Sequence, residues 1–229
     1  IAVRFWSSAD ASLSDLAILR IFRPPSFNST MFRSPSCVLL LALATATFAQ
    51  RPTATLVNPG LMRLDLEGNR LFAGLPDPSI GVDDIALFPV EPASPVAGGR
   101  TFMPSMEGEL LDRRTERLGE KTAIFVHAVP TPYGDTAHYS YLVSWNDRRI
   151  WFSGLSTDPT ALLAATDLDL VFLSPAMARA IEATGKRMNT RMMVLYPLPE
   201  GYDGSEPSGP YDYCKVLAPA VGESIQLFR

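Results

Sequence analysis

Two histidines are the residues of this chain best suited to metal or acid–base chemistry, because imidazole binds metals and titrates near neutral pH. His127 lies within an apolar run, which favours a hydrogen-bonded histidine in the core or at a sheet edge over a metal ligand. His138 follows residues 133–136, Tyr-Gly-Asp-Thr, where Asp135 could orient its ring. A metal site needs three or four converging ligands, so we interpret His138 as a solvated loop residue.

Acidic side chains and one thiol complete the set of candidates. Glu91 and Asp158 could join Asp135 in acid–base chemistry, because two close carboxylates can divide the roles of acid and base. The simpler interpretation is solvation in loops and, for Asp158, capping of a helix whose first residue is Pro159. Cys214 could be a nucleophile beside an aligned histidine, but packing is the favoured interpretation.

The first half of the sequence is expected to form β-strands paired in hairpins, and these strands would position the candidate residues. Residues 60–72 alternate between apolar and polar side chains around a turn at Gly68-Asn69, which indicates a β-hairpin. The apolar run 85–88 ends at Pro89 and is typical of a buried strand. Further strands are expected at residues 121–129 and, as a hairpin turned at Asn146-Asp147, at residues 139–144 and 149–153.

Helices alternate with strands in the second half. The pattern predicts helices beginning at Pro159 and Ala176, the second ending at Gly185, and a further helix at residues 211–217. Strands are predicted at residues 168–173, 192–196 and 224–228. Hairpins followed by alternating helices and strands favour an α/β fold with two sheets and helices on their outer faces.

The front of the chain has the features of an export signal. Residues 31–33, Met-Phe-Arg, form a short positive region, and the apolar run 37–49 follows. In the last three residues of that run, Thr47 and Ala49 put small side chains at the two positions that a signal peptidase recognises. We therefore expect residues 1–30 to be an upstream extension, residues 31–49 a cleaved signal peptide, and residues 50–229 one secreted or periplasmic domain. The apolar run is too short to span a bilayer, and no lipidation cysteine follows it, so no stable membrane anchor is expected.

Composition limits the partners of residues 50–229. Four of the 20 basic and two of the 24 acidic residues precede Gln50, which leaves a net charge of −6. The remaining Lys and Arg residues occur as isolated pairs, so a nucleic acid is not an expected partner. Cys214 is the one cysteine after Gln50, which excludes a disulfide within the expected domain.

Several segments resemble the metallo-β-lactamase superfamily, especially its small lactonase-like hydrolases. The resemblance is clearest for residues 148–154, Arg-Arg-Ile-Trp-Phe-Ser-Gly, followed by residues 157–159 and 167–173, and it extends to residues 193–197 and 222–225. It implies an α/β fold, a metallo-β-lactamase-like αββα sandwich of two facing sheets with outer helices, shortened in its first half. It also implies that the loops beginning at Pro89, Gly134, Leu155 and Pro197 meet at one edge, with Glu91, His138 and Ser156 near one another.

The family's chemistry uses two metal ions that activate a bridging water. The resemblance places His138 near the family's middle histidine. The other ligand positions fall on residues that cannot reproduce the family's set, namely Pro89, Glu91, Ala93, Ser94, Leu155 and Pro199. The usual dinuclear site therefore cannot be assembled, and no cofactor is expected.

The leading hypothesis is an exported metallo-β-lactamase-fold protein that binds no metal, a pseudoenzyme or binding protein whose partner is an unknown small molecule or protein at the vestigial cleft. One alternative is a divergent metal-dependent hydrolase with a single zinc held by His138 together with Glu91, Asp135 or Asp158. Another is an inactive, truncated gene product.

Overall fold

The computed structural model describes residues 51–96, 100–106, 114–118, 122–200, 209 and 211–228. The chain divides into two units between Thr47 and Phe48, and every described residue belongs to the second. The expected upstream extension and signal peptide, residues 1–30 and 31–49, lie outside the described residues. None of the helices in the described part of the chain has the length and apolar content needed to span a membrane.

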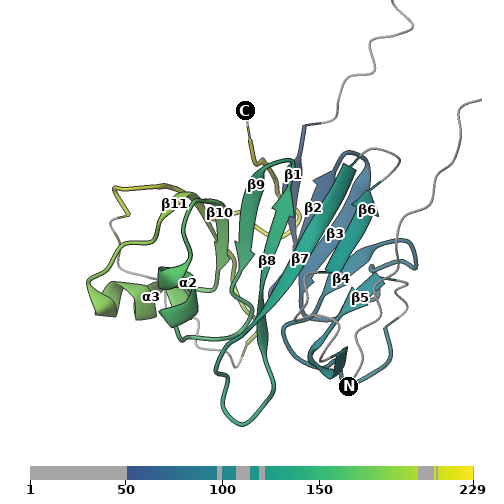
Figure 1. Ribbon diagram of the computed structural model, residues 1–229, viewed down its shortest axis with the longest axis horizontal. Helices are drawn as coiled ribbons and strands as arrows, with labels where there is room; N and C mark the ends of the chain where they lie inside the picture. Colours follow the sequence, from purple (N-terminus) through teal and green to yellow (C-terminus); the bar gives the residue numbers. More distant parts are fainter. Residues whose placement is uncertain are drawn as a thin grey trace, which may run out of the picture. The chain divides into compact units, whose positions relative to one another are not determined.

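The first of two sheets has six strands in the order β13-β1-β2-β3-β4-β5 (Figure 1). The strands are β1 (Thr53–Asn58), β2 (Leu61–Leu66), β3 (Asn69–Gly74), β4 (Ile85–Leu87), β5 (Arg100–Phe102) and β13 (Ser224–Gln226). The expected first hairpin is present as β2 and β3, with Leu66 opposite Asn69. The turn lies one residue earlier than expected, at Glu67 and Gly68, because Asn69 already pairs with Leu66 as the first residue of β3; their φ angles of 50° and 80° suit a tight hairpin turn.

The second sheet has seven strands in the order β12-β11-β10-β9-β8-β7-β6. They are β6 (Arg114–Leu118), β7 (Thr122–Pro130), β8 (Tyr139–Trp145), β9 (Arg148–Phe152), β10 (Leu168–Leu173), β11 (Thr190–Leu195) and β12 (Lys215–Leu217). β6 to β9 form an antiparallel meander, whereas β9 to β12 run parallel. Asn146 and Asp147 turn the β8–β9 hairpin, as expected, with positive φ angles.

The prediction of a helix at residues 211–217 is wrong. Lys215–Leu217 is strand β12, which pairs with β11 so that Val216 lies opposite Met193 and Leu217 opposite Val194. The exposed edge of a parallel sheet offers this segment a full row of backbone partners, and that tertiary pairing outweighs local helix preference.

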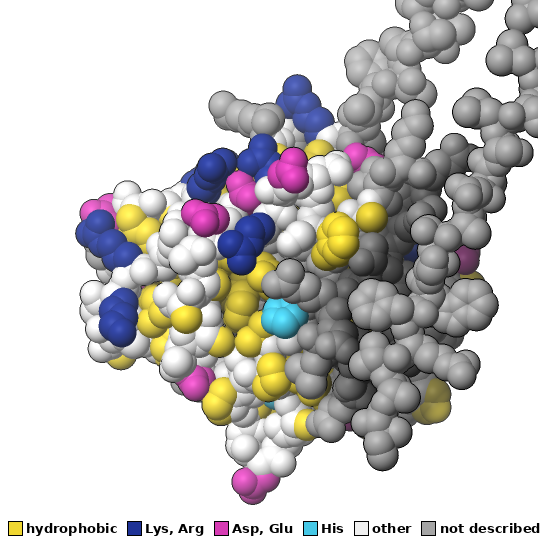
Figure 2. Space-filling view, in the orientation of Figure 1, with side chains coloured by type: hydrophobic (Ala, Val, Ile, Leu, Met, Phe, Trp, Pro, Cys, Tyr) yellow, Lys and Arg dark blue, Asp and Glu magenta, His cyan; other side chains and the backbone are white. Residues whose placement is uncertain are grey.

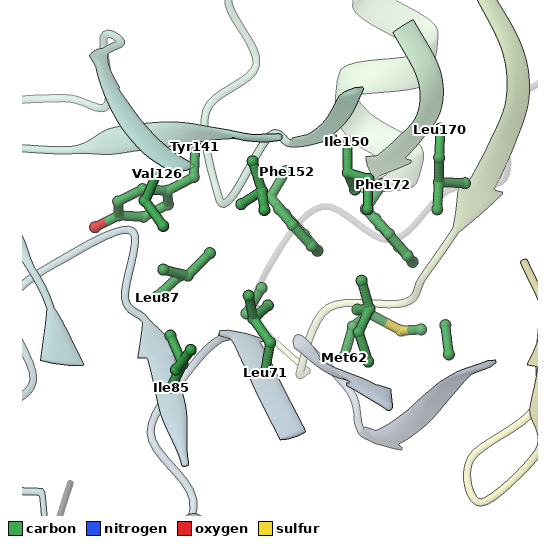
Figure 3. Packing of buried hydrophobic residues seen from close by; sticks show 14 of the residues in the cluster. Met62, Leu71, Ile85, Leu87, Val126, Tyr141, Ile150, Phe152, Leu170 and Phe172 are labelled. Atoms are coloured by element: carbon green, nitrogen blue, oxygen red, sulfur yellow. The ribbon is translucent and has the colours of Figure 1, made fainter. Parts of the chain in front are cut away.

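Apolar side chains from both sheets fill the space between them (Figure 3). Phe152 of β9 and Phe172 of β10 stack with their ring centroids 4.8 Å apart, and Leu71 and Met62 approach them from the first sheet. Burial of each such side chain stabilises the fold by about 1.5–3 kcal/mol. The two sheets therefore share one core.

Both helices of the described residues, α2 (Thr160–Ala164) and α3 (Pro175–Thr184), pack on the outer face of the second sheet. α3 begins at Pro175, one residue before the expected Ala176, and the hydroxyl of its N-cap residue Ser174 accepts a hydrogen bond from the amide of Met177. It ends at Gly185 with a φ angle of 66°. α2 begins one residue later than expected, with Pro159 as its N-cap residue.

No helix interrupts the crossover from β4 to β5 within its described residues, 88–96. A short 3₁₀ helix, η1 (Pro104–Met106), follows β5. The outer face of the first sheet carries Phe72, Ile80 and Phe88, against which Val96 and Met103 pack. Irregular chain therefore packs on this face of the first sheet.

Candidate functional site

Several loops meet where the parallel strands of the second sheet end. The chain leaves β9 through Ser153, Gly154 and Leu155, and the Tyr196 hydroxyl after β11 donates to the Gly154 carbonyl over 3.1 Å. The amide of Tyr139 donates to the Pro89 carbonyl over 2.9 Å, which joins the loop after β4 to the start of β8. We call the region formed by Pro89, residues 131–140, Gly154, Leu155 and Tyr196 the vestigial edge.

His138 occupies the middle of the vestigial edge and is buried, with 3% of its surface exposed. The expectation of a solvated loop residue is therefore wrong. The amide of Leu155 donates to Nε2 over 2.9 Å, so Nε2 carries no proton. The proton of the neutral ring then lies on Nδ1, which is 2.7 Å from the Thr131 hydroxyl oxygen and donates to it.

Burial also decides the charge of this histidine. Removal of the ring from water lowers the pKa of His138 to about 4, and hydrogen bonding to the backbone of Thr131 opposes the shift more weakly. The imidazole is thus neutral at pH 7. Both of its nitrogens are then engaged by groups of the protein.

A chain of buried hydroxyls continues from His138. The Ser140 hydroxyl donates to the Ser153 carbonyl over 3.0 Å, so the Thr131 hydroxyl donates to Ser140 over 3.1 Å and its oxygen is left to accept from His138. All donors in the chain thus point the same way, an arrangement in which each bond strengthens the next. Thr131, Ser140 and Ser153 are buried. The chain fixes the imidazole and the start of the loop after β9 together.

Gly154 shows how closely the vestigial edge is packed. Its φ angle of +62° favours glycine, and an added Cβ would lie 2.6 Å from the Cβ of Pro89 and 2.7 Å from Nε2 of His138. Leu155 follows with 4% of its surface exposed, at the position where the resemblance puts the bridging aspartate. The space around Gly154 is therefore filled by Pro89 and His138.

The acidic candidates make hydrogen bonds neither with His138 nor with one another in the described part of the chain. Asp135 is exposed, and the orienting role expected of it belongs to Thr131. The Glu91 carboxylate accepts from the amide and the hydroxyl of Ser105, each over 3.1 Å. No group of three or more His, Cys, Asp or Glu side chains suited to a metal occurs among the described residues.

Asp158 has a local role beside α2. Its Oδ1 accepts from the amide of Thr160 over 2.9 Å and from the Thr160 hydroxyl, and these hydrogen bonds lower the pKa of Asp158. The carboxylate therefore meets the first amide of the helix, although Pro159 is the N-cap residue. Ser156 nearby donates to the Pro132 carbonyl over 2.7 Å, which ties the loop after β9 to the loop before β8.

The remaining expected ligand positions line or border a cavity of about 760 Å³ beyond Pro89. Residues from segments 75–80 and 90–96 form its wall, including Glu91, Ala93 and Ser94. Pro199 lies near this cavity, since it and Leu75 both approach Gly60. Apolar side chains and prolines predominate, and the charged groups are the carboxylates of Asp77 and Glu91.

No protein-family model and no curated protein sequence matches this chain. Among solved structures, it is similar to a Parabacteroides distasonis protein assigned as a metal-dependent hydrolase, with a TM-score of 0.52, 15% identity and coverage of 73% of this chain and 92% of that one. It is also similar to the metallo-β-lactamase fold protein YhfI from Bacillus subtilis, with a TM-score of 0.50, 9% identity and coverage of 77% and 99%. The chain has the metallo-β-lactamase fold. This confirms the fold class that the resemblance implied.

The metal ions that the metallo-β-lactamase fold implies do not fit the residues present. Pro89 and Leu155 are buried and have no ligating atom in their side chains, Ala93 has none either, and Ser94 is exposed on the cavity wall. Nε2 of His138 accepts the Leu155 amide and has no lone pair left for a metal. Hydrogen bonds and close packing hold together the strand ends that ligands would otherwise join.

Thr131, Ser140 and Tyr196 are contributors to this edge that sequence reasoning missed. The hydroxyl of Tyr196 is buried, and burial raises its pKa to about 12, so it stays protonated and donates. The position of Tyr196 at the end of the predicted strand 192–196, within a segment that carries the family resemblance, was the available signal. Thr131 and Ser140 had no local signal.

Proposed function

We propose that this protein is a pseudoenzyme of the metallo-β-lactamase fold, which binds a small molecule or a protein without metal-dependent hydrolysis. The observation that carries the proposal is the hydrogen bond from the Leu155 amide to Nε2 of His138. A zinc ligand must offer the same lone pair that this amide uses. Metal binding would require that bond to break and the packed loop at Gly154 to move.

The binding part of the proposal rests on the cavity next to the vestigial edge. Its volume of about 760 Å³ is in the range of small-molecule sites, and its wall is apolar with two carboxylates, Asp77 and Glu91. Hydrogen bonds from Asn58 and Ser79 reach Asp77, and those from Ser79 contribute most to a lowered pKa, so this group is ionised at neutral pH. A ligand at this site would meet an apolar, negatively charged surface.

We also propose that the protein acts after export, as a secreted or periplasmic domain without a stable membrane anchor. Support comes from residues 31–49, whose sequence is that of a signal peptide. A nucleic acid remains an unexpected partner, because Lys and Arg occur as isolated pairs in the sequence and the net charge is negative.

Elemental analysis of the purified protein tests the proposal. After dialysis we expect no stoichiometric zinc, iron or manganese, and no change in metal content between the native chain and a His138→Gln variant. One metal ion per chain that is retained through dialysis, lost in His138→Gln and kept in the matched His127→Gln variant would overturn it. That result would favour a divergent hydrolase with a single zinc held by His138.

A further inference from the structure

A second cavity lies at the opposite end of the parallel strands. It has a volume of about 740 Å³ and is lined where β9, β10, β11 and β12 begin, whereas the vestigial edge lies where β9 to β11 end. Its other wall is β13 of the first sheet and the residues that follow it. Since β12 and β13 are the edge strands of the two sheets, the cavity opens at the side of the sandwich. We call it the edge groove.

Charged side chains surround the edge groove. Figure 2 shows Lys, Arg, Asp and Glu side chains gathered in the upper part of the view, over the end of the sheet where β8 passes into β9. Those that line the groove are Arg148, Arg191, Lys215 and one carboxylate, Asp169. The groove therefore has three cations for one anion.

Asp169 cannot neutralise these cations. Its carboxylate accepts hydrogen bonds from the Arg148 guanidinium at 2.9 Å and from the Arg149 amide at 3.0 Å, and it forms an ion pair with Arg191 at 3.3 Å. The single carboxylate is thus shared by two guanidinium groups, which leaves one of their charges unbalanced. Lys215 is exposed and adds a second. The described lining has a net charge of +2 in a protein whose overall charge is negative.

The floor of the edge groove is apolar. Met192, Leu217, Ile225 and Phe228 line it, and each is only partly buried while it packs against the shared core. The Arg148 guanidinium lies over the Phe228 ring, 5.1 Å from its centroid, which holds the cation at the boundary between the apolar floor and solvent. Partly exposed apolar groups beside unbalanced cations form a surface that is complementary to an amphiphilic anion.

We propose that the edge groove binds a free organic monoanion with an apolar body, such as a medium-chain carboxylate. The chain of the ligand lies on Met192, Leu217 and Ile225, where it removes apolar surface from water. Its carboxylate lies toward Arg191 and Lys215, whose positive charge is not fully neutralised by Asp169. A cationic ligand of the same shape meets a net positive rim and is excluded, so the sign of the head group decides binding.

Titration calorimetry with decanoate tests this proposal on the purified protein, with decylammonium as the matched cation. We expect saturable binding of one decanoate per chain and none of decylammonium at the same concentrations. Arg191→Gln and Lys215→Gln should each weaken binding about two- to fivefold, as expected for exposed charge pairs. Lys186→Gln removes an exposed cation outside the groove and should leave binding unchanged.

Three results would overturn the proposal. The first is no saturable binding of decanoate by protein that still unfolds cooperatively. The second is unchanged affinity in the Arg191→Gln/Lys215→Gln double variant, whose exposed side chains can be replaced without loss of the fold. The third is binding to phosphatidylglycerol vesicles with no binding of free decanoate, which would assign the same cations to a lipid surface. The outcome is independent of metal content at the vestigial edge.

Discussion

Acidification should destabilise this protein through His138. Burial lowers the pKa of the folded imidazole to about 4 from the ordinary value of 6.5 that the unfolded chain retains. Between these pH values the unfolded state binds more protons, so the free energy of unfolding rises with pH. The contribution of His138 to stability is complete above about pH 6.5, and it is lost as the pH falls toward 4.

The two pKa values fix the size of the effect. Their separation of about 2.5 units corresponds to about 3 kcal/mol in total, of which about 2 kcal/mol is lost by pH 5. The hydrogen bond between the Leu155 amide and Nε2 explains this loss of stability. A proton on Nε2 would face the amide hydrogen of Leu155, so that two donors would meet across 2.9 Å. Asp77 and Asp158 also have lowered pKa values, but their contributions are lost only below their ordinary value of 3.8. Of these three groups, His138 is therefore the one that contributes to the change from pH 7.5 to 5.

Urea unfolding at pH 7.5, 6 and 5 measures this effect in the native chain and in His138→Gln. Glutamine can accept the Leu155 amide but does not titrate, so its free energy of unfolding should vary little over this range. His127→Gln, which changes the other histidine, should retain the pH dependence of the native chain. The reasoning is refuted if His138→Gln shows the same dependence, or if the native chain changes by less than about 0.5 kcal/mol.

Two further predictions concern the packed loop and the front of the chain. Gly154→Ala should lower the free energy of unfolding by more than about 2 kcal/mol, because the new Cβ would overlap Pro89. Gly185→Ala, which has a similar φ angle of 66° and no atom near its Cβ, should cost only about 1 kcal/mol, and equal losses in urea unfolding would contradict the packing argument. N-terminal sequencing of the exported form should begin at Gln50, and carbonate washing should release it from membranes. An intact residue 1 or retention on membranes would contradict the export proposal.

The sequence predicts the fold well where local rules agree with packing. Asn146-Asp147 turns the hairpin it was expected to turn, and Ser174 and Gly185 bound α3 as the preferences of helix ends require. The prediction for segment 211–217 was wrong because its secondary structure depends on a partner strand. Its apolar residues fit a helix or a strand locally, and only the open edge of β11 decides between them.

The site was harder to predict than the fold. The lack of other ligands favoured a solvated His138, and residues 134–137 are indeed exposed, yet the next residue, His138, is buried and lies against Gly154 from a distant strand end. The sequence predicts that the expected ligand positions cannot reproduce the metal set, because a ligand requires a particular residue type at each position. The contacts that these positions make instead depend on distances between strand ends, which no local pattern encodes.

The vestigial edge explains why a single substitution cannot create a metal centre here. An aspartate at position 155 would place a carboxylate in a buried site beside a neutral imidazole, with no described cation in contact to offset the cost of removing it from water. Nε2 of His138 would still accept the backbone amide at 155, because that donor does not depend on the side chain. Pro89 would still fill the space against Gly154. The replacements thus support one another, and ligation would require several of them to change together.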